Sequence, residues 1–464
     1  MTTTTLSLPT GARMFRRSFL AVALTLGLGA CDSLLDTSPP DQVDDTKAVQ
    51  TQAGARAALA GAYGALQSGY YYGGTLTHFG DLYADNAVHT GTFVVYQEAS
   101  NKDLRPDSRE VQGAWNDIYE AIKRANVLIA RVPNITFDDP VEQDQILGEA
   151  HFLRALNYFN LVRMYGGVPL RTSPVTDANE AANITRSTEA EVYVQILQDL
   201  TDAEGLITNT GSTNHANVNA VHALRAKVYL TQGNNAGALT EANIVQAQGY
   251  SLPASYSDNF NGDDVETSET IFRLTFTSNL DQNNLLGYYW QTYSDGGRYE
   301  IAPSQSLMNA YDTLGTDTRF TWNIKPDPTD GYTESYASSQ KWPTVNGGED
   351  LPILRYADML LTKAEAFANL GNVDSAVAYY NPIRTRAGLP AHVSGVDVTT
   401  AQQALDEIDL QRRLEFFGEG HRFFDLVRMG RFVPVATPDA FRVLWPIPQS
   451  EITVAPNITQ NPGY

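Results

Sequence analysis

The sequence predicts a mainly α-helical fold in which paired helices stack into an interrupted α–α superhelix, with long irregular loops and a few short strands. Apolar side chains recur at spacings of three and four residues over several long segments, which is typical of the buried face of a helix. In addition, a small, an aromatic, a glycine and another small residue occur twice in that order, at spacings of three, four and five. The two copies are Ala226, Tyr229, Gly233 and Ala238, and Ala364, Phe367, Gly371 and Ala376.

This repeated pattern matches the helix pair of tetratricopeptide repeats. Alanine allows two helices to approach closely, and glycine permits the tight turn between them. Ala60 with Tyr63 and Ala155 with Tyr158 repeat the first half of the pattern. Because the copies are separated rather than tandem, we expect helix pairs that share one core, with functional loops between them.

Five helices are predicted in chain order before the second copy of the pattern. They span residues 46–68, 111–132, 146–165, 189–207 and 218–231. Residues near 249–350 are predicted to form a loop-rich insert. The stretch of Asp295, Gly296, Gly297 and Arg298 in this insert is typical of a turn.

The composition excludes several classes of function. The 464 residues carry a formal net charge of -21, which argues against binding to nucleic acid and against charge-driven adhesion to anionic lipid. An acidic surface with few lysines fits either a salty habitat or ordinary acidic solubility. The single cysteine and the scattered histidines form no recognisable metal-binding motif, and the sequence contains neither a phosphate-binding loop nor a nucleophile elbow. We therefore expect no metal, no cofactor and no enzymatic activity.

The N-terminal segment has the layout of a lipoprotein signal peptide. Arginines at positions 13, 16 and 17 precede an apolar run over residues 19–28, and Leu28, Gly29, Ala30 and Cys31 then resemble a bacterial lipobox. We predict a signal peptide over residues 1–30, lipidation of Cys31, a tether over residues 31–45 and one domain over residues 46–464. The alternative is a plain secretory signal that is followed by a chance cysteine.

Residues 408–428 combine many charges with four phenylalanines. Charges that lie beside buried rings destabilise a fold unless they are paired. We therefore predict a structural ion-pair network, with Gly418 and Gly420 ending one helix before the next begins. The predicted members are Arg412, Arg413, Glu415, Glu419, Arg422, Asp425 and Arg428. A catalytic carboxylate pair is the alternative interpretation of these charges.

The same stretch resembles the signature of the SusD/RagB family of outer-membrane nutrient-binding lipoproteins. All seven charged residues of the predicted network and Gly420 match the family pattern, whereas Gln411 stands where the family usually has an acid. Residues 353–367, 381–388, 446–448 and 460–463 resemble further family motifs. The positions of Trp115, Tyr119, Ile122 and Asn126 do so as well. The resemblance runs from residue 31 to residue 464.

The resemblance implies a function in nutrient capture. A member of this family is expected to be anchored by lipid in the cell outer membrane and to face outside the cell. It is expected to bind oligosaccharide and to pass it to a SusC-like TonB-dependent transporter. Two alternatives remain open, namely peptide cargo and a helical glycoside hydrolase, which would need two carboxylates about 5–10 Å apart. A third interpretation is a protein scaffold that binds no small ligand.

Two aromatic regions are candidates for the ligand site, the first over residues 70–96 and the second over residues 288–299. Trp and Tyr offer a flat apolar face for a sugar ring together with a polar edge, and Asp, Asn and Arg can hydrogen-bond to hydroxyls. The candidate ligand contacts are Tyr71, Tyr72, Asp85, Asn86, Tyr96, Tyr289, Trp290, Tyr293 and Arg298. A weaker set comprises Trp322, Tyr332, Tyr336 and Trp342. The alternative for each aromatic side chain is a place in the core.

Overall fold

The computed structural model describes residues 49–175, 182–209, 211–260, 262, 264–278, 284–325, 337–433 and 439–464. The predicted signal peptide, the lipidation site at Cys31, the whole predicted tether, Tyr332 and Tyr336 lie outside these ranges. Residues 49–464 belong to one compact unit. None of the helices within the described ranges is both long enough and apolar enough to cross a membrane.

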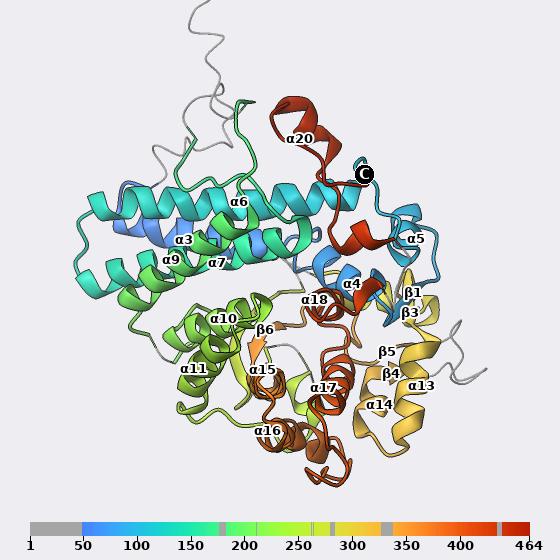
Figure 1. The fold of residues 1–464 in the computed structure, drawn as a ribbon. Helices are drawn as coiled ribbons and strands as arrows, with labels where there is room; N and C mark the ends of the chain where they lie inside the picture. The colour runs from blue at the N-terminus through green and yellow to red at the C-terminus, as the bar shows by residue number, and fades with distance from the viewer. Residues whose placement is uncertain are drawn as a thin grey trace, which may run out of the picture. The chain divides into compact units, whose positions relative to one another are not determined.

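Four helices of the N-terminal half pack side by side (Figure 1). They are α3 (Gln52–Leu66), α6 (Arg109–Arg131), α7 (Pro140–Tyr165) and α9 (Glu189–Leu206). Local sequence sets where they begin. The Thr51 and Asp139 side chains accept hydrogen bonds from backbone N–H groups at the starts of α3 and α7, and Thr188 forms a capping box with Glu191 on α9.

The two helix pairs of the repeat pattern, together with α17 and α18, form the second group. They are α10 (Val218–Thr231), α11 (Asn235–Gln246), α15 (Tyr356–Asn369), α16 (Val373–Arg386), α17 (Ala401–Glu415) and α18 (Arg422–Arg428). Gly233 and Gly371 lie between the paired helices at φ values of 74° and 79°, where a side chain would be strained. Ala238 of α11 and Ala366 of α15 pack in one cluster with Leu230, so the second copy of the pattern stacks on the first. The predicted mainly helical, tetratricopeptide-like fold is confirmed.

The insert between α11 and α15 consists of short elements rather than of loops alone. They are η2 (Tyr256–Asn259), β2 (Thr270–Leu274), α12 (Leu286–Trp290), η3 (Tyr293–Asp295), β3 (Ile301–Pro303), α13 (Gln305–Leu314), α14 (Thr318–Asn323), β4 (Ile324–Lys325), β5 (Ser338–Ser339) and β6 (Leu351–Arg355). In the described ranges, strands pair antiparallel as β1–β3, β2–β6 and β4–β5. Because β1 (Ala87–His89) belongs to the first aromatic region, its pairing with β3 brings that region beside the second one.

The first aromatic region is not simply a loop. It contains α4 (Thr75–Leu82), β1 and α5 (Val94–Ser100), and every residue of α4 is buried. The helix packs against α18, and a Cβ on Gly80 would lie 2.4 Å from backbone atoms of Gly420. The contact therefore depends on glycine at position 80. The remaining short elements are η1 (Val132–Asn134), η4 (Ala440–Val443) and α20 (Gln449–Val454).

Candidate functional site

The two aromatic regions meet at a pocket of about 400 Å³. The turn after α3, the first residues of α4 and α6, helix α5, and α12 with the residue before it supply its walls. The lining residues are Ser68, Gly69, Tyr70, Thr75, Phe93, Val94, Val95, Tyr96, Arg109, Glu110, Leu285 and Tyr289. The pocket is thus assembled from segments that lie up to about 220 residues apart in the sequence.

Three aromatic rings of the pocket support one another. The ring of Tyr289 lies 5.3 Å from that of Tyr96 and 5.9 Å from that of Phe93, in both cases edge to face. The Tyr96 hydroxyl lies 3.2 Å from Nδ1 of the buried His78, whose pKa burial lowers to about 3, so that this imidazole is neutral at physiological pH. Mutual packing therefore holds the rings in one arrangement, which favours binding by a preformed surface.

Charged side chains occupy the rim and the floor. Arg109 is exposed at the rim, where its Nε donates a hydrogen bond to the Tyr70 hydroxyl. Beside the lining, the Arg298 guanidinium lies 3.9 Å from the centroid of Phe93 and pairs with Glu300 at 2.9 Å. Glu110 lies deeper and is 8% exposed, and burial raises the pKa of its carboxyl. The pocket thus combines flat apolar faces with hydroxyls and a desolvated carboxylate.

Several predicted ligand residues lie at or near this pocket. Tyr96 and Tyr289 line it, and Arg298 stacks on the lining residue Phe93. Tyr293 lies in η3 with 68% of its surface exposed and is not part of the lining. Tyr70 and Glu110 were missed by the sequence prediction. Tyr70 directly precedes two tyrosines that were chosen, whereas no local pattern marks Glu110 on α6.

Three predicted ligand contacts lie in the core instead, which corrects their assignment. Tyr71 and Trp290 are fully buried and Tyr72 is 7% exposed. The Tyr71 hydroxyl donates to Asn157 Oδ1 at 2.7 Å. Trp290 is the last residue of α12 rather than part of a loop, and its indole packs edge to face on Phe417 at 5.1 Å. Trp342 of the weaker set is also buried, and its indole N–H donates a hydrogen bond to the Gly418 carbonyl.

Asp85 and Asn86 are bound by the arginines of the charged stretch rather than presented to a ligand. Arg422 Nε donates to Asp85 at 2.7 Å, and Arg413 Nε donates to the Asn86 side-chain oxygen at 2.9 Å. The Asn86 amide in turn donates to Asp81 at 2.6 Å. The side-chain oxygens of Asp85 and Asn86, which were predicted to bind a ligand, therefore accept hydrogen bonds from arginines instead.

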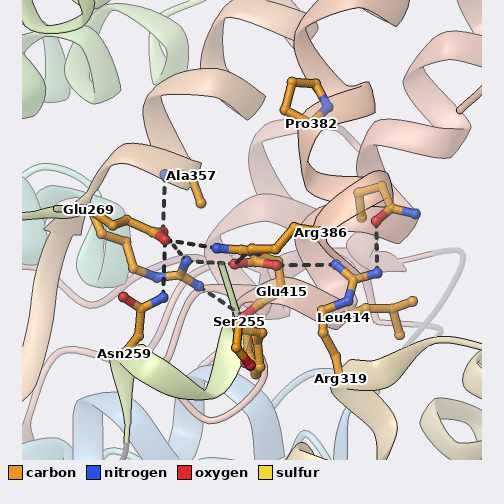
Figure 2. A network of polar contacts seen from close by, with 12 residues as sticks. Ser255, Asn259, Glu269, Arg319, Ala357, Pro382, Arg386, Leu414 and Glu415 are labelled. Atoms are coloured by element: carbon orange, nitrogen blue, oxygen red, sulfur yellow. Dashed lines mark hydrogen bonds and ion pairs between the residues drawn. The ribbon is translucent and has the colours of Figure 1, made fainter. Parts of the chain in front are cut away.

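The charged stretch forms one buried network around Glu415. The carboxylate of Glu415 accepts hydrogen bonds from Arg355 at 2.6 Å, from Arg319 at 3.2 Å and from Arg386. Figure 2 shows Arg386 and Arg319 reaching Glu415 from opposite sides, with Arg386 also bound to Glu269. Burial alone would raise the pKa of Glu415, but the guanidinium groups of Arg386, Arg355 and Arg319 hold it well below its usual range.

Further ion pairs extend from this centre. Arg355 Nη2 donates to Glu419 at 2.8 Å, and the fully buried Lys341 Nζ donates to the same carboxylate at 2.6 Å. At the position where the family pattern has an acid, Gln411 accepts a hydrogen bond from Arg319 Nη2 at 2.8 Å. A neutral amide thus satisfies one of the donors of this arginine.

All seven predicted members of the network make ion pairs. The pairs not yet described join Arg412 to Asp358 and Asp425, Arg413 to Asp85, Arg422 to Asp409, and Arg428 to Glu365 and Asp425. No motif or periodicity marked Arg319 and Lys341, which come from the insert. Arg355 and Arg386 lie in family motifs, but their partners could not be identified from sequence.

One group of residues has the composition of a metal site. His151, Asp199 and Asp202 place potential ligand atoms within 4.8 Å of one another, on the facing helices α7 and α9. Arg154, however, binds both oxygens of Asp199 at 2.6 and 2.9 Å. A metal ion would have to compete with this guanidinium for the same carboxylate, so we assign no metal to the group.

Comparisons with known proteins agree on one family. The model of the SusD family matches residues 247–436, and a model described as starch-binding associating with outer membrane matches residues 33–230. A SusD-like protein of Formosa agariphila is 28% identical over 499 aligned residues, which cover 96% of this chain and 98% of the relative. The starch-binding protein SusD of Bacteroides thetaiotaomicron is 22% identical, with 77% and 79% covered. The solved structure of a laminarin-binding SusD-like protein aligns with a TM-score of 0.78 at 26% identity and covers 89% of this chain and 100% of that one.

Proposed function

Because the chain belongs to the SusD/RagB family, we propose that it is a surface glycan-binding lipoprotein of the outer membrane. It captures oligosaccharide and passes it to a SusC-like TonB-dependent transporter. Its similarity to a starch-binding protein and to a laminarin-binding protein supports a glycan ligand. The match of residues 33–230 to a family of starch-binding proteins that associate with the outer membrane supports the location.

The observation that carries this proposal is the aromatic pocket between the two regions. A sugar ring has an apolar face and a rim of hydroxyls, and the rings of Tyr289, Tyr96 and Phe93 stand beside hydroxyl and carboxylate groups. About 400 Å³ lies within the range of small-ligand sites. Capture and release need affinity without bond cleavage, and a preformed pocket of this kind provides it.

Hydrolysis is the less favoured reading of this pocket. A glycoside hydrolase needs two carboxyl groups about 5–10 Å apart across the scissile bond. Among the described residues that line the pocket, Glu110 is the only acid. Peptide cargo would use the same apolar faces, so a competition assay between oligosaccharides and peptides separates these two ligand classes.

Replacing Tyr289 with alanine is expected to weaken oligosaccharide binding by about ten- to a hundredfold, because a stacking face and its buried area are lost. Calorimetric titration with neutral oligosaccharides measures this change. Tyr293→Ala is the matched variant, since Tyr293 is exposed and does not line the pocket. If the two variants lose oligosaccharide affinity equally, the pocket would not be the binding site, and the surface around η3 would take its place.

The proposed anchor is tested separately. Cys31→Ser is expected to abolish lipidation and to release the protein from membranes, since acyl chains contribute roughly 0.8 kcal/mol per buried CH₂. Cell fractionation followed by immunoblotting measures the released fraction. Membrane retention equal to that of the wild type would contradict the anchor. Co-purification of a TonB-dependent barrel from detergent-solubilised outer membranes tests the proposed partner.

A further inference from the structure

Glu110 lines the pocket, and one oxygen of its carboxylate accepts no hydrogen bond from the described residues. It lies in the first turn of α6 and is 8% exposed. Its Oε2 is shielded from water and has no hydrogen-bond partner among the described residues. A buried carboxylate oxygen without a donor is destabilising, so such a group in a pocket indicates a role other than folding.

No neighbouring cation donates a hydrogen bond to this oxygen, although the charge of Arg109 partly offsets the rise that burial causes in the pKa of Glu110. Arg109, the adjacent residue, directs its Nε to the Tyr70 hydroxyl. Arg298 is paired with Glu300, and Arg105 pairs with Glu98 at 3.1 Å. Among the described lining residues, Glu110 is thus the one carboxylate that shares the pocket with the rings of Tyr96 and Tyr289.

We propose that Glu110 is the specificity-determining residue of this pocket. It accepts hydrogen bonds from the hydroxyl groups of an uncharged saccharide and excludes saccharides that carry carboxylate or sulfate groups. This inference rests on the proposed function, because it assigns a class of ligand to the same site.

Two physical effects would produce the discrimination. A hydrogen bond from a sugar hydroxyl to a carboxylate is charge-assisted and thus stronger than one to a neutral acceptor, and it would satisfy the desolvated group. The terminal torsion of glutamate is broad and nearly two-fold, so either oxygen can turn toward the ligand. An anionic ligand would instead place like charge beside Glu110 in a partly desolvated pocket, where repulsion is stronger than in water.

The test uses matched probes that differ in charge only at C6. The probes are laminarihexaose, maltohexaose and cellohexaose, each compared by calorimetry with its counterpart oxidised to the carboxylate at C6. The wild-type full chain in detergent micelles is expected to bind at least one neutral hexaose about tenfold or more tightly than its oxidised counterpart. Glu110→Gln keeps the size of the side chain but removes its charge. It is expected to weaken neutral binding about tenfold and to bring the two affinities within about threefold of each other.

Glu120→Gln is the control, since Glu120 lies on the same helix with 41% of its side chain exposed. It should keep the wild-type preference. Equal or tighter binding of an oxidised probe by the wild type would overturn the inference, because Arg109 at the rim would then be the determinant. An unchanged preference in Glu110→Gln would overturn it as well. The comparison of neutral and oxidised probes on the wild type requires no mutation. It therefore tests the predicted charge preference even if Glu110→Gln folds poorly. If none of the three neutral probes binds, the proposed glycan function itself would be overturned. If neutral probes bind without a preference over their oxidised counterparts, only the role of Glu110 would be overturned.

Discussion

Glu415→Gln is expected to lower the free energy of unfolding by about 3–5 kcal/mol, because it removes the carboxylate that three buried guanidinium groups share. Arg319, Arg355 and Arg386 all donate to this side chain, and Glu415 itself is fully buried. The glutamine keeps an oxygen acceptor but leaves excess positive charge in a dry environment. Urea unfolding followed by circular dichroism measures the change.

Asp406→Asn provides the control on the same helix, α17. Asp406 pairs with Arg431 at 2.6 Å, but 58% of its side chain is exposed, so its loss should change stability by less than about 1 kcal/mol. Because the pKa of Glu415 is depressed in the folded state, its contribution is complete at neutral pH and is lost only as pH falls through that lowered pKa. Wild-type stability in Glu415→Gln, combined with lost ligand binding, would instead make Glu415 a site residue.

Trp290→Ala is also expected to destabilise the protein by about 3–5 kcal/mol, since it would leave a large cavity in the core. The indole is fully buried against Phe417, and the Phe417 carbonyl accepts a hydrogen bond from Lys341. The loss of packing therefore reaches the charge network as well. Thermal and urea unfolding of the purified variant measure the effect.

Tyr293→Ala is the comparison for this substitution, because Tyr293 follows three residues later and is 68% exposed. We expect its unfolding to match that of the wild type within about 0.5 kcal/mol. An unchanged unfolding transition in Trp290→Ala together with weakened oligosaccharide binding would contradict the assignment of Trp290 to the core. It would restore the interpretation of Trp290 as a sugar platform.

Helical periodicity and the repeat pattern were sufficient to predict the fold class. Both signals are local, because alanine, aromatic and glycine positions within one helix pair determine how that pair packs. The predicted helix over residues 218–231 coincides with α10, and the one over residues 189–207 differs from α9 by a single residue. The short elements of the insert could not be predicted from the sequence, because its strands are stabilised by pairing with distant partners, as β3 is by β1.

The site was predicted at the level of regions but not of individual residues. Whether a tyrosine or tryptophan faces a ligand or the core depends on segments far away in the sequence. Tyr71 is buried by its bonds to α7, and Trp290 by the turn after α17. Glu110 was missed for the same reason, since only the folded chain places it opposite Tyr289 in one pocket.

The shared carboxylate of Glu415 also bears on the order in which the protein can fold during synthesis. A nascent chain that ends before α17 already contains Arg319, Arg355 and Arg386, but it lacks the group that all three bind. Asp317 and Glu269 can pair with these cations earlier, but all of the pairs form only when Glu415 is present, so we expect the packing of this region to be completed only with the last helices. If the protein is exported as an outer-membrane lipoprotein, as we propose, this delay would keep the growing chain in a form that can cross a membrane.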